Sequence, residues 1–147
     1  MNTALSAEGN EKMFVNDEHI EFYQENIEKC RYQDVYHKAL IYCLGISSEV
    51  RRKVERIYDF ENEEIKPECL KEGWVTGGFA KVIRLAFNLF CNDTPSIYEY
   101  EDDLEEAIRE CKYYAVEDIF CCEYGSYFFQ AIMIRYPEYF RNEKGGF

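Results

Sequence analysis

Hydrophobic residues recur at helical spacing along most of the chain, and they are densest between residues 76 and 92. In this stretch the regularly spaced apolar positions are Phe79, Val82, Ile83, Ala86, Phe87 and Phe90. Leu85 and Leu89 widen the apolar surface beyond one stripe. Its polar edge consists of Lys81, Arg84 and Asn88. The pattern predicts a central helix that other helices enclose, with the polar edge facing water or a buried polar partner.

Narrower apolar stripes predict further helices on both sides of the central one. They begin at Asn16 or Asp17, at Asp34, after Ser47, at Pro67, at Glu99, at Val116 and at Ser126, and the last runs to Tyr136 before Pro137. Predicted inward residues are Ile20, Tyr23, Ile27 and Cys30, then Tyr36, Ala39, Leu40 and Cys43, and later Leu104, Ala107, Ile108 and Cys111. Residues 59–66 are predicted as a loop, and two-residue alternation at 97–101 allows a short edge strand.

The predicted fold is all-α: one compact domain of about six to seven helices around the central helix at residues 76–92. The domain is expected to span residues 16–140. Residues 1–15 are polar and lack a period, so they predict a flexible N-terminal arm, and residues 141–147 predict a loose C-terminal tail. A chain of 147 residues is long enough to bury roughly two thirds of its unfolded surface.

The chain is strongly acidic, with 17 Lys and Arg against 29 Asp and Glu and a net charge of −12. Such a surface repels phosphate backbones and anionic lipids and attracts basic proteins. Acidic residues concentrate in one amphipathic segment: Glu99, Glu101, Asp102, Asp103, Glu105, Glu106 and Glu110. Only Arg109 opposes them. We expect these carboxylates to face outward as a surface that binds a basic protein partner.

One basic segment supports a different hypothesis. The residues from Leu44 to Ile57 predict a glycine-containing turn followed by a helix with four exposed bases, Arg51, Arg52, Lys53 and Arg56. That order is similar to a helix-turn-helix, in which the second helix enters the major groove of DNA. The spacing around Gly45 departs from the motif, and the charge of the whole chain disfavours DNA. A DNA-binding regulator is therefore the alternative hypothesis.

Cysteine and histidine chemistry gives a third hypothesis, a small enzyme or metal protein. The seven cysteines have no C-x-x-C spacing, and His19 and His37 are isolated from each other. No metal ligand, cofactor or catalytic residue is therefore predicted. No signal-peptide pattern opens the sequence, so reduced thiols in the cytoplasm are expected.

Some polar and aromatic residues in apolar surroundings are candidates for a pocket or a buried ion pair. A pocket is considered at Tyr36, His37, Trp74 and Arg84. Because a buried arginine needs a carboxylate, Arg84 or Arg135 is expected to pair with Glu117 or Asp118. Thr76 is the predicted cap of the central helix, and the glycines that follow it lack the register of a phosphate-binding loop.

Several short runs together resemble a family of uncharacterised acidic helical proteins from bacterial conjugative and prophage elements. They are DVYHKALIYCLG (34–45), RIYDF (56–60), EGW (72–74), VIRLAFNL (82–89), VEDIFCC (116–122) and RYPEYF (135–140). The resemblance implies no reaction and no cofactor. It implies a role in which a small acidic protein occupies the nucleic-acid channel of a host defence enzyme. The leading hypothesis is thus a non-enzymatic binding protein, acting as an inhibitor or nucleic-acid mimic.

Overall fold

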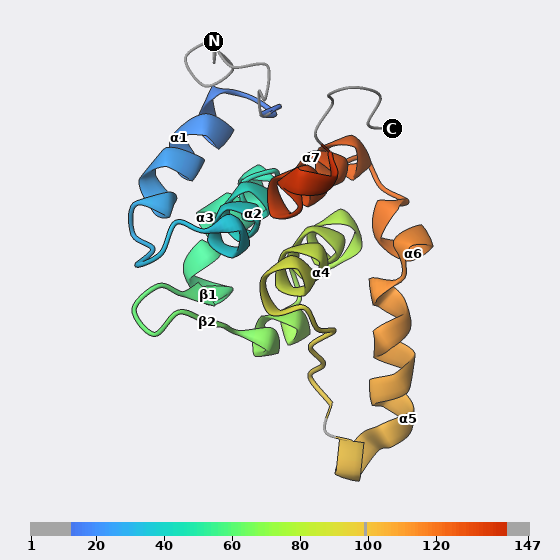
Figure 1. The fold of residues 1–147 in the computed structure, drawn as a ribbon. Helices are drawn as coiled ribbons and strands as arrows, with labels where there is room; N and C mark the ends of the chain where they lie inside the picture. Colours follow the sequence, from blue (N-terminus) through green and yellow to red (C-terminus); the bar gives the residue numbers. More distant parts are fainter. Residues whose placement is uncertain (1–12, 99, 141–147) are drawn as a thin grey trace.

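The computed structural model describes residues 13–98 and 100–140, and these residues form a mostly helical domain (Figure 1). The α-helices are α1 (Asp17–Ile27), α2 (Val35–Leu44), α3 (Ser48–Arg52), α4 (Gly77–Cys91), α5 (Tyr100–Cys111), α6 (Val116–Phe120) and α7 (Gly125–Arg135). Short 3-10 turns are η2 (Val54–Arg56), η3 (Pro67–Lys71), η4 (Lys112–Tyr114) and η5 (Pro137–Tyr139). The prediction of an all-α fold is confirmed.

Two helices form the centre of the molecule. Helix α4 is buried over most of its surface, as its sequence predicts, and it packs on α2, α6, α7 and η4. Helix α2 is buried even more completely, because it lies between α1, α4 and α7, and residues 39–44 have no exposed surface. Thr76 occupies the N-cap position of α4, but its side chain makes no capping hydrogen bond.

A small hairpin stands where the sequence predicts a loop. Strand β1 (Tyr58–Asp59) pairs antiparallel with β2 (Glu64–Ile65). Its turn closes because the Asp59 carboxylate accepts the Glu61 and Asn62 amides, and because Glu63 adopts a left-handed φ of 58°. Pairing of two residues per strand leaves no periodic signal in the sequence. The alternation at residues 97–101 does not produce the predicted edge strand. Residues 97 and 98 form a bend, residue 99 lies outside the described residues, and residues 100 and 101 belong to α5.

Several helix ends and faces differ from the predictions. The basic helix stops at Arg52, because Lys53 leaves helical geometry (φ −116°, ψ 26°) and a 3-10 turn follows. Helix α7 begins at Gly125, so Ser126 lies inside its first turn. The inward face of α1 is rotated: His19, Phe22, Tyr23 and Asn26 are buried, whereas Ile20 and Ile27 are half-buried. Tyr36 is exposed on α2, and its neighbour His37 is buried instead.

The core also includes one residue from the predicted N-terminal arm. Phe14 lies within the predicted arm of residues 1–15, yet it is buried against the rings of His19, Tyr23 and Tyr42. The Tyr42 hydroxyl also donates to the Met13 carbonyl. An aromatic cluster at the end of α1 therefore holds this segment, which sequence periodicity could not detect. The remainder of the predicted arm and the predicted tail, residues 1–12 and 141–147, lie outside the described residues.

His19 is buried in a single tautomer that joins α1 to α2. Its Nε2–H donates to the Tyr42 carbonyl at 2.8 Å, and its Nδ1 accepts the Val15 amide at 3.1 Å. The neutral ring satisfies both contacts, whereas a second ring proton would face the N–H of Val15. Burial lowers the pKa of His19 to about 4. Gly45 allows the close packing, because a Cβ there would lie 2.6 Å from His19 Cδ2.

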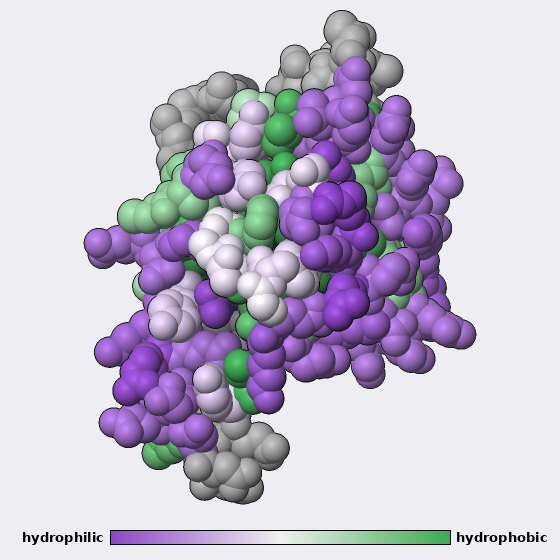
Figure 2. Space-filling model, turned by 180° about the vertical axis from the view of Figure 1, so that it is seen from behind, coloured by the Kyte–Doolittle hydropathy of each residue, from purple (hydrophilic) through white to green (hydrophobic). Residues whose placement is uncertain are grey.

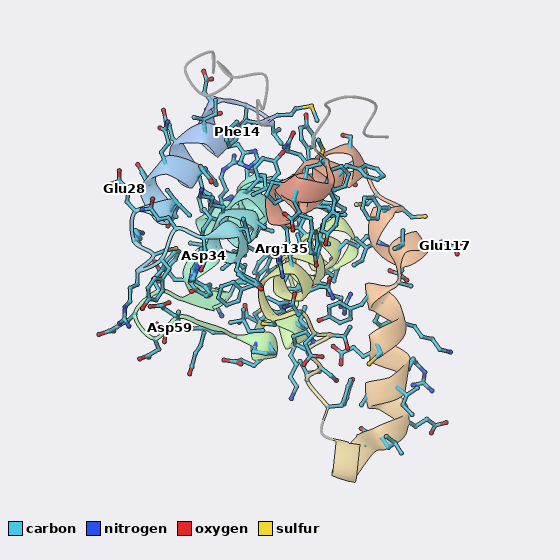
Figure 3. All side chains as sticks on the ribbon, in the orientation of Figure 1. Phe14, Glu28, Asp34, Asp59, Glu117 and Arg135 are labelled. Carbon is cyan, nitrogen blue, oxygen red and sulfur yellow. The ribbon has the colours of Figure 1, made fainter. Side chains whose placement is uncertain are left out.

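Arg135 joins α7 to the end of α4 (Figure 3). Its Nε donates to the Leu89 carbonyl at 2.9 Å, and its Nη2 donates to Asn92 Oδ1 at 2.8 Å. Its guanidinium lies 3.8 Å from the ring centre of Tyr36 and 4.5 Å from that of Tyr136. The predicted pairing with Glu117 or Asp118 is therefore wrong. Asp118 pairs instead with Lys81, at 3.0 Å.

Replacing Arg135 with Met should lower the free energy of unfolding by about 1–3 kcal/mol, because Leu89 and Asn92 each lose a buried donor and the two rings lose a cation. Urea denaturation followed by circular dichroism measures the change. Arg52→Met is the matched control: Arg52 is exposed and, within the described residues, its ion pair is with Glu49 in the same turn, so its loss should leave stability nearly unchanged. Equal unfolding midpoints for wild type and Arg135→Met would contradict the role assigned to Arg135.

Acidification should destabilise the fold through His19. The unfolded chain takes up this proton near pH 6.5, but the folded chain resists it until about pH 4. Stability from this group is thus complete above pH 6.5 and is lost as the pH falls to about 4, by roughly 3 kcal/mol. Proton NMR of the two histidines checks the cause: the His19 ring signal should not shift between pH 8 and about pH 5. A midpoint near 6.5 would contradict it.

Candidate functional site

Helix α5, which carries most of the acidic segment, lies along the side of the molecule, away from the bundle of α2, α4 and α7 (Figure 1). Its most extensive contact is with η4, which follows it in the chain. In the space-filling view it forms the narrow, mostly hydrophilic lobe at the lower left (Figure 2). This arrangement leaves a large part of the helix surface open to solvent.

The apolar stripe of α5 is only partly covered. Ala107 is fully buried, but Leu104 and Ile108 are 53% and 52% exposed. These two side chains lie one helical turn apart, and we call them the α5 ridge. The sequence predicts that both face the core, so this part of the prediction is wrong. Paired exposed aliphatic residues on an otherwise charged helix are typical of a surface that binds another protein.

Glu110 determines how α5 is rotated. Its Oε1 accepts the Ser96 hydroxyl at 2.6 Å and the Ile97 amide at 3.2 Å, and the residue is 4% exposed. Nearby, the Tyr114 hydroxyl donates to the Pro95 carbonyl at 2.7 Å. Glu110 therefore faces inward, contrary to the prediction that all these acids face solvent. Because the helix face that carries Glu110 packs on residues 95–97, the α5 ridge is turned toward solvent.

The remaining acids of the segment fall into three groups. Glu106 pairs with Arg109 one turn away. Glu105 is exposed beside the α5 ridge, and Asp103 is half-buried at a kink where the backbone leaves helical geometry (φ −150°, ψ 59°). Glu99 and the side chains of Glu101 and Asp102 lie outside what the structure describes. Of the acids whose side chains the structure describes, Glu105 lies beside the ridge, whereas Glu110 faces the body of the molecule.

Each of the four bases of the alternative DNA-binding segment has a partner within the chain. Arg51 donates to the Gly45 carbonyl, Arg52 and Lys53 share the carboxylate of Glu49, and Arg56 pairs with Glu72. Lys53 also lies 4.6 Å from the ring centre of Trp74. A helix of five residues with internally paired charges differs from a recognition helix, whose bases must be free to meet DNA.

The four residues considered for a pocket lie in separate surroundings. Tyr36 stacks on Arg135, and Trp74 lies 6.2 Å from Phe79 between ring centres and donates to Glu72. Arg84 lies 4.7 Å from the ring centre of Tyr113. His37 faces two carboxylates, with Nδ1 2.7 Å from Asp34 Oδ1 and Nε2 3.5 Å from Glu63 Oε1. The structure does not bring the four together into one site.

The His37 contacts connect the β-hairpin to α2. Glu63, which occupies the left-handed turn position, also pairs with Arg31 at 3.2 Å. This cluster leaves no signal in the sequence, because Glu63 comes from a charged stretch without a period.

Five of the cysteine thiols have a raised pKa, which makes them weak nucleophiles. None of the seven cysteines, all of which lie in the described residues, forms a disulfide. Burial raises the pKa of Cys30 to about 11 and that of Cys69 to about 12. Burial likewise raises the pKa of Cys43 and, less strongly, those of Cys91 and Cys122. A reactive cysteine needs a lowered pKa, so these five are poor candidates for catalysis.

Among residues 13–98 and 100–140, no group of three or more His, Cys, Asp or Glu side chains is arranged to hold a metal ion. In the same ranges, no helix has the length and apolar character needed to cross a membrane.

Comparison with known families identifies the family to which the chain belongs. Residues 9–146 match the model of a family of unknown function, DUF6075. The chain belongs to this family. No curated protein and no solved structure matches the chain. The resemblance to an uncharacterised family is thus confirmed, and the family match begins before Phe14, in agreement with the burial of that residue.

Glu110→Ala should release α5 from the body, because Ser96 and Ile97 lose their shared acceptor. Hydrogen–deuterium exchange should show faster exchange for the amides of residues 104–111, while those of α2 stay protected. Glu105→Ala provides the control, since Glu105 is exposed on the same helix. If both variants exchange like wild type in this segment, Glu110 does not determine the position of α5.

Proposed function

We propose that the protein is a non-enzymatic binding module, and that it uses α5 to bind a protein partner. The partner site would be an apolar groove with lysine and arginine at its rim. The observation that carries the proposal is the α5 ridge, two half-exposed aliphatic side chains on an acidic helix. The amphipathic helix would place these residues in the groove as anchors, with the carboxylates along the rim.

Burial of the α5 ridge supplies the free energy of binding in this proposal. A single exposed Leu is ordinary on a protein surface, but Leu104 and Ile108 lie side by side on one helix face. Burying the exposed half of each side chain in a groove is worth roughly 1 kcal/mol or more per residue. The kink at Asp103 separates the regular helix from the residues before it, so the anchors lie in its first two turns.

Charge favours a basic protein over the other partners considered. Nucleic acid and anionic membranes are repelled by a net charge of −12. A second copy of the chain, joined ridge to ridge, would bring two acidic helices together. A basic rim instead pairs with Glu105 and with the acids around it, which adds specificity and speeds association.

We further propose that the partner is a nucleic-acid-handling defence protein of the host, which the chain inhibits by occupying its nucleic-acid channel. The resemblance to proteins of conjugative and prophage elements suggests this class, since a channel built for phosphates presents basic side chains. The seven cysteines, all within the described residues, form no disulfide, which is consistent with action in a reducing compartment such as the cytoplasm.

A cross-linking experiment tests the proposal. A photoreactive phenylalanine analogue at position 108 should cross-link one protein in a lysate of the source cells, and the same analogue at Tyr32, exposed in the α1–α2 connection, should not. The captured protein is then purified and its dissociation constant measured by calorimetry. Leu104→Asp with Ile108→Asp should weaken this binding by about 10- to 100-fold, and higher salt should weaken wild-type binding.

Tyr32→Asp is the control variant, because it adds one negative charge, against the two of the double variant, at an exposed ring away from α5. It should bind as wild type does. Binding that survives the double substitution would overturn the use of α5, and binding insensitive to salt would overturn the basic rim. Sedimentation of the chain alone at high concentration distinguishes the self-association alternative, in which the double variant would dissociate a dimer.

A further inference from the structure

A pocket of about 190 Å³ lies between α5 and the body of the molecule. Its apolar walls include Leu70 and Ile97, and the rings of Tyr98 and Tyr113 line it as well. Its charged walls come from α4 and α5. An engineered cavity of about 150 Å³ is enough to hold benzene, so a ligand the size of one substituted ring fits this volume.

The charged side chains around the pocket differ in whether they have a hydrogen-bond or ion-pair partner. Arg109 pairs with Glu106, and Glu110 accepts hydrogen bonds from Ser96 and Ile97. Arg84 forms no ion pair among the described residues, and its Nε–H is buried without an acceptor there. The predicted partners Glu117 and Asp118 are not used. Arg84 is therefore the one cation of this lining, within the described residues, that lacks a carboxylate.

The surroundings of Arg84 fix its orientation without satisfying its donors. Its guanidinium lies over the ring of Tyr113, which holds one flat face of the group. Stacking of this kind leaves the N–H groups at the edge of the plane. A buried guanidinium N–H without an acceptor is costly, and a carboxylate at that edge would accept two parallel hydrogen bonds.

We propose that this pocket binds a small organic monocarboxylate with an apolar body. The edge of Arg84 would bind the carboxylate, and the body would lie against Leu70, Ile97 and the tyrosine rings. A single negative charge is required, because Glu106 and Glu110 lie in the same lining and would repel a dianion such as phosphate. The pocket lies at the base of α5, so binding here needs no protein partner.

Titration of the purified full-length chain with sodium benzoate, followed by NMR, tests the proposal. Benzoate should shift the Arg84 Nε–H and Ile97 amide resonances in a saturable way. Benzamide has the same shape without the charge and should bind at least tenfold more weakly. Inorganic phosphate should bind more weakly than benzoate. Equal binding of benzoate and benzamide would overturn the ion pair, and tighter binding of phosphate would overturn the single-charge assignment.

Two variants keep the test independent of folding. Arg84→Gln should reduce benzoate affinity at least tenfold, whereas Arg56→Gln, on an exposed arginine paired with Glu72, should leave it unchanged. Ile97→Trp keeps Arg84 and fills the pocket, so it should also abolish binding. Folding of each variant is checked by circular dichroism. Benzoate binding that persists in folded Arg84→Gln or in folded Ile97→Trp would overturn the proposal.

Discussion

Enclosure of α4 is the constraint on which the rest of the structure depends. A helix that is apolar over most of its circumference cannot face water, so α2 and α7 pack against it and the other elements are arranged around these three. The carbonyl end of α4 also needs donors. Arg135 supplies them from α7, and it is itself held between two tyrosine rings.

This use of Arg135 changes how charge is distributed in the molecule. A buried arginine is expected to pair with a carboxylate, yet here a backbone carbonyl, an amide oxygen and aromatic faces replace the acid. No acid is consumed in that role, and Asp118 is left to pair with Lys81. The same substitution of a ring for an acid occurs at Arg84, which lies over Tyr113. At these two arginines, cation–π contacts with tyrosine rings therefore take the place of an ion pair with a carboxylate.

The position of α5 shows how one buried acid can shape a surface. Glu110 faces the body because residues 96 and 97 provide two donors, and its inward position turns the α5 ridge outward. An acidic helix with its apolar stripe inward would be only a solvated face. With the stripe turned out, it combines anchors and charge in the manner of a helix that docks in a groove.

The sequence by itself determined the all-α class, the central helix at residues 76–92, and the caps at Asn16, Asp34 and Ser47, since all of these depend on short-range periodicity or on side chains within one turn. Only the tertiary structure decided which residues face inward on α1 and α5, where Arg84 and Arg135 find their contacts, and that residues 58–65 form a hairpin. Apart from the hairpin, whose two-residue strands are too short to leave a period, these features depend on contacts between residues distant in the chain. For the candidate site, the sequence indicated an acidic helix, whereas the fold decided that Leu104 and Ile108 are exposed, because a hydrogen-bonded acid and not hydrophobicity fixes the rotation of that helix.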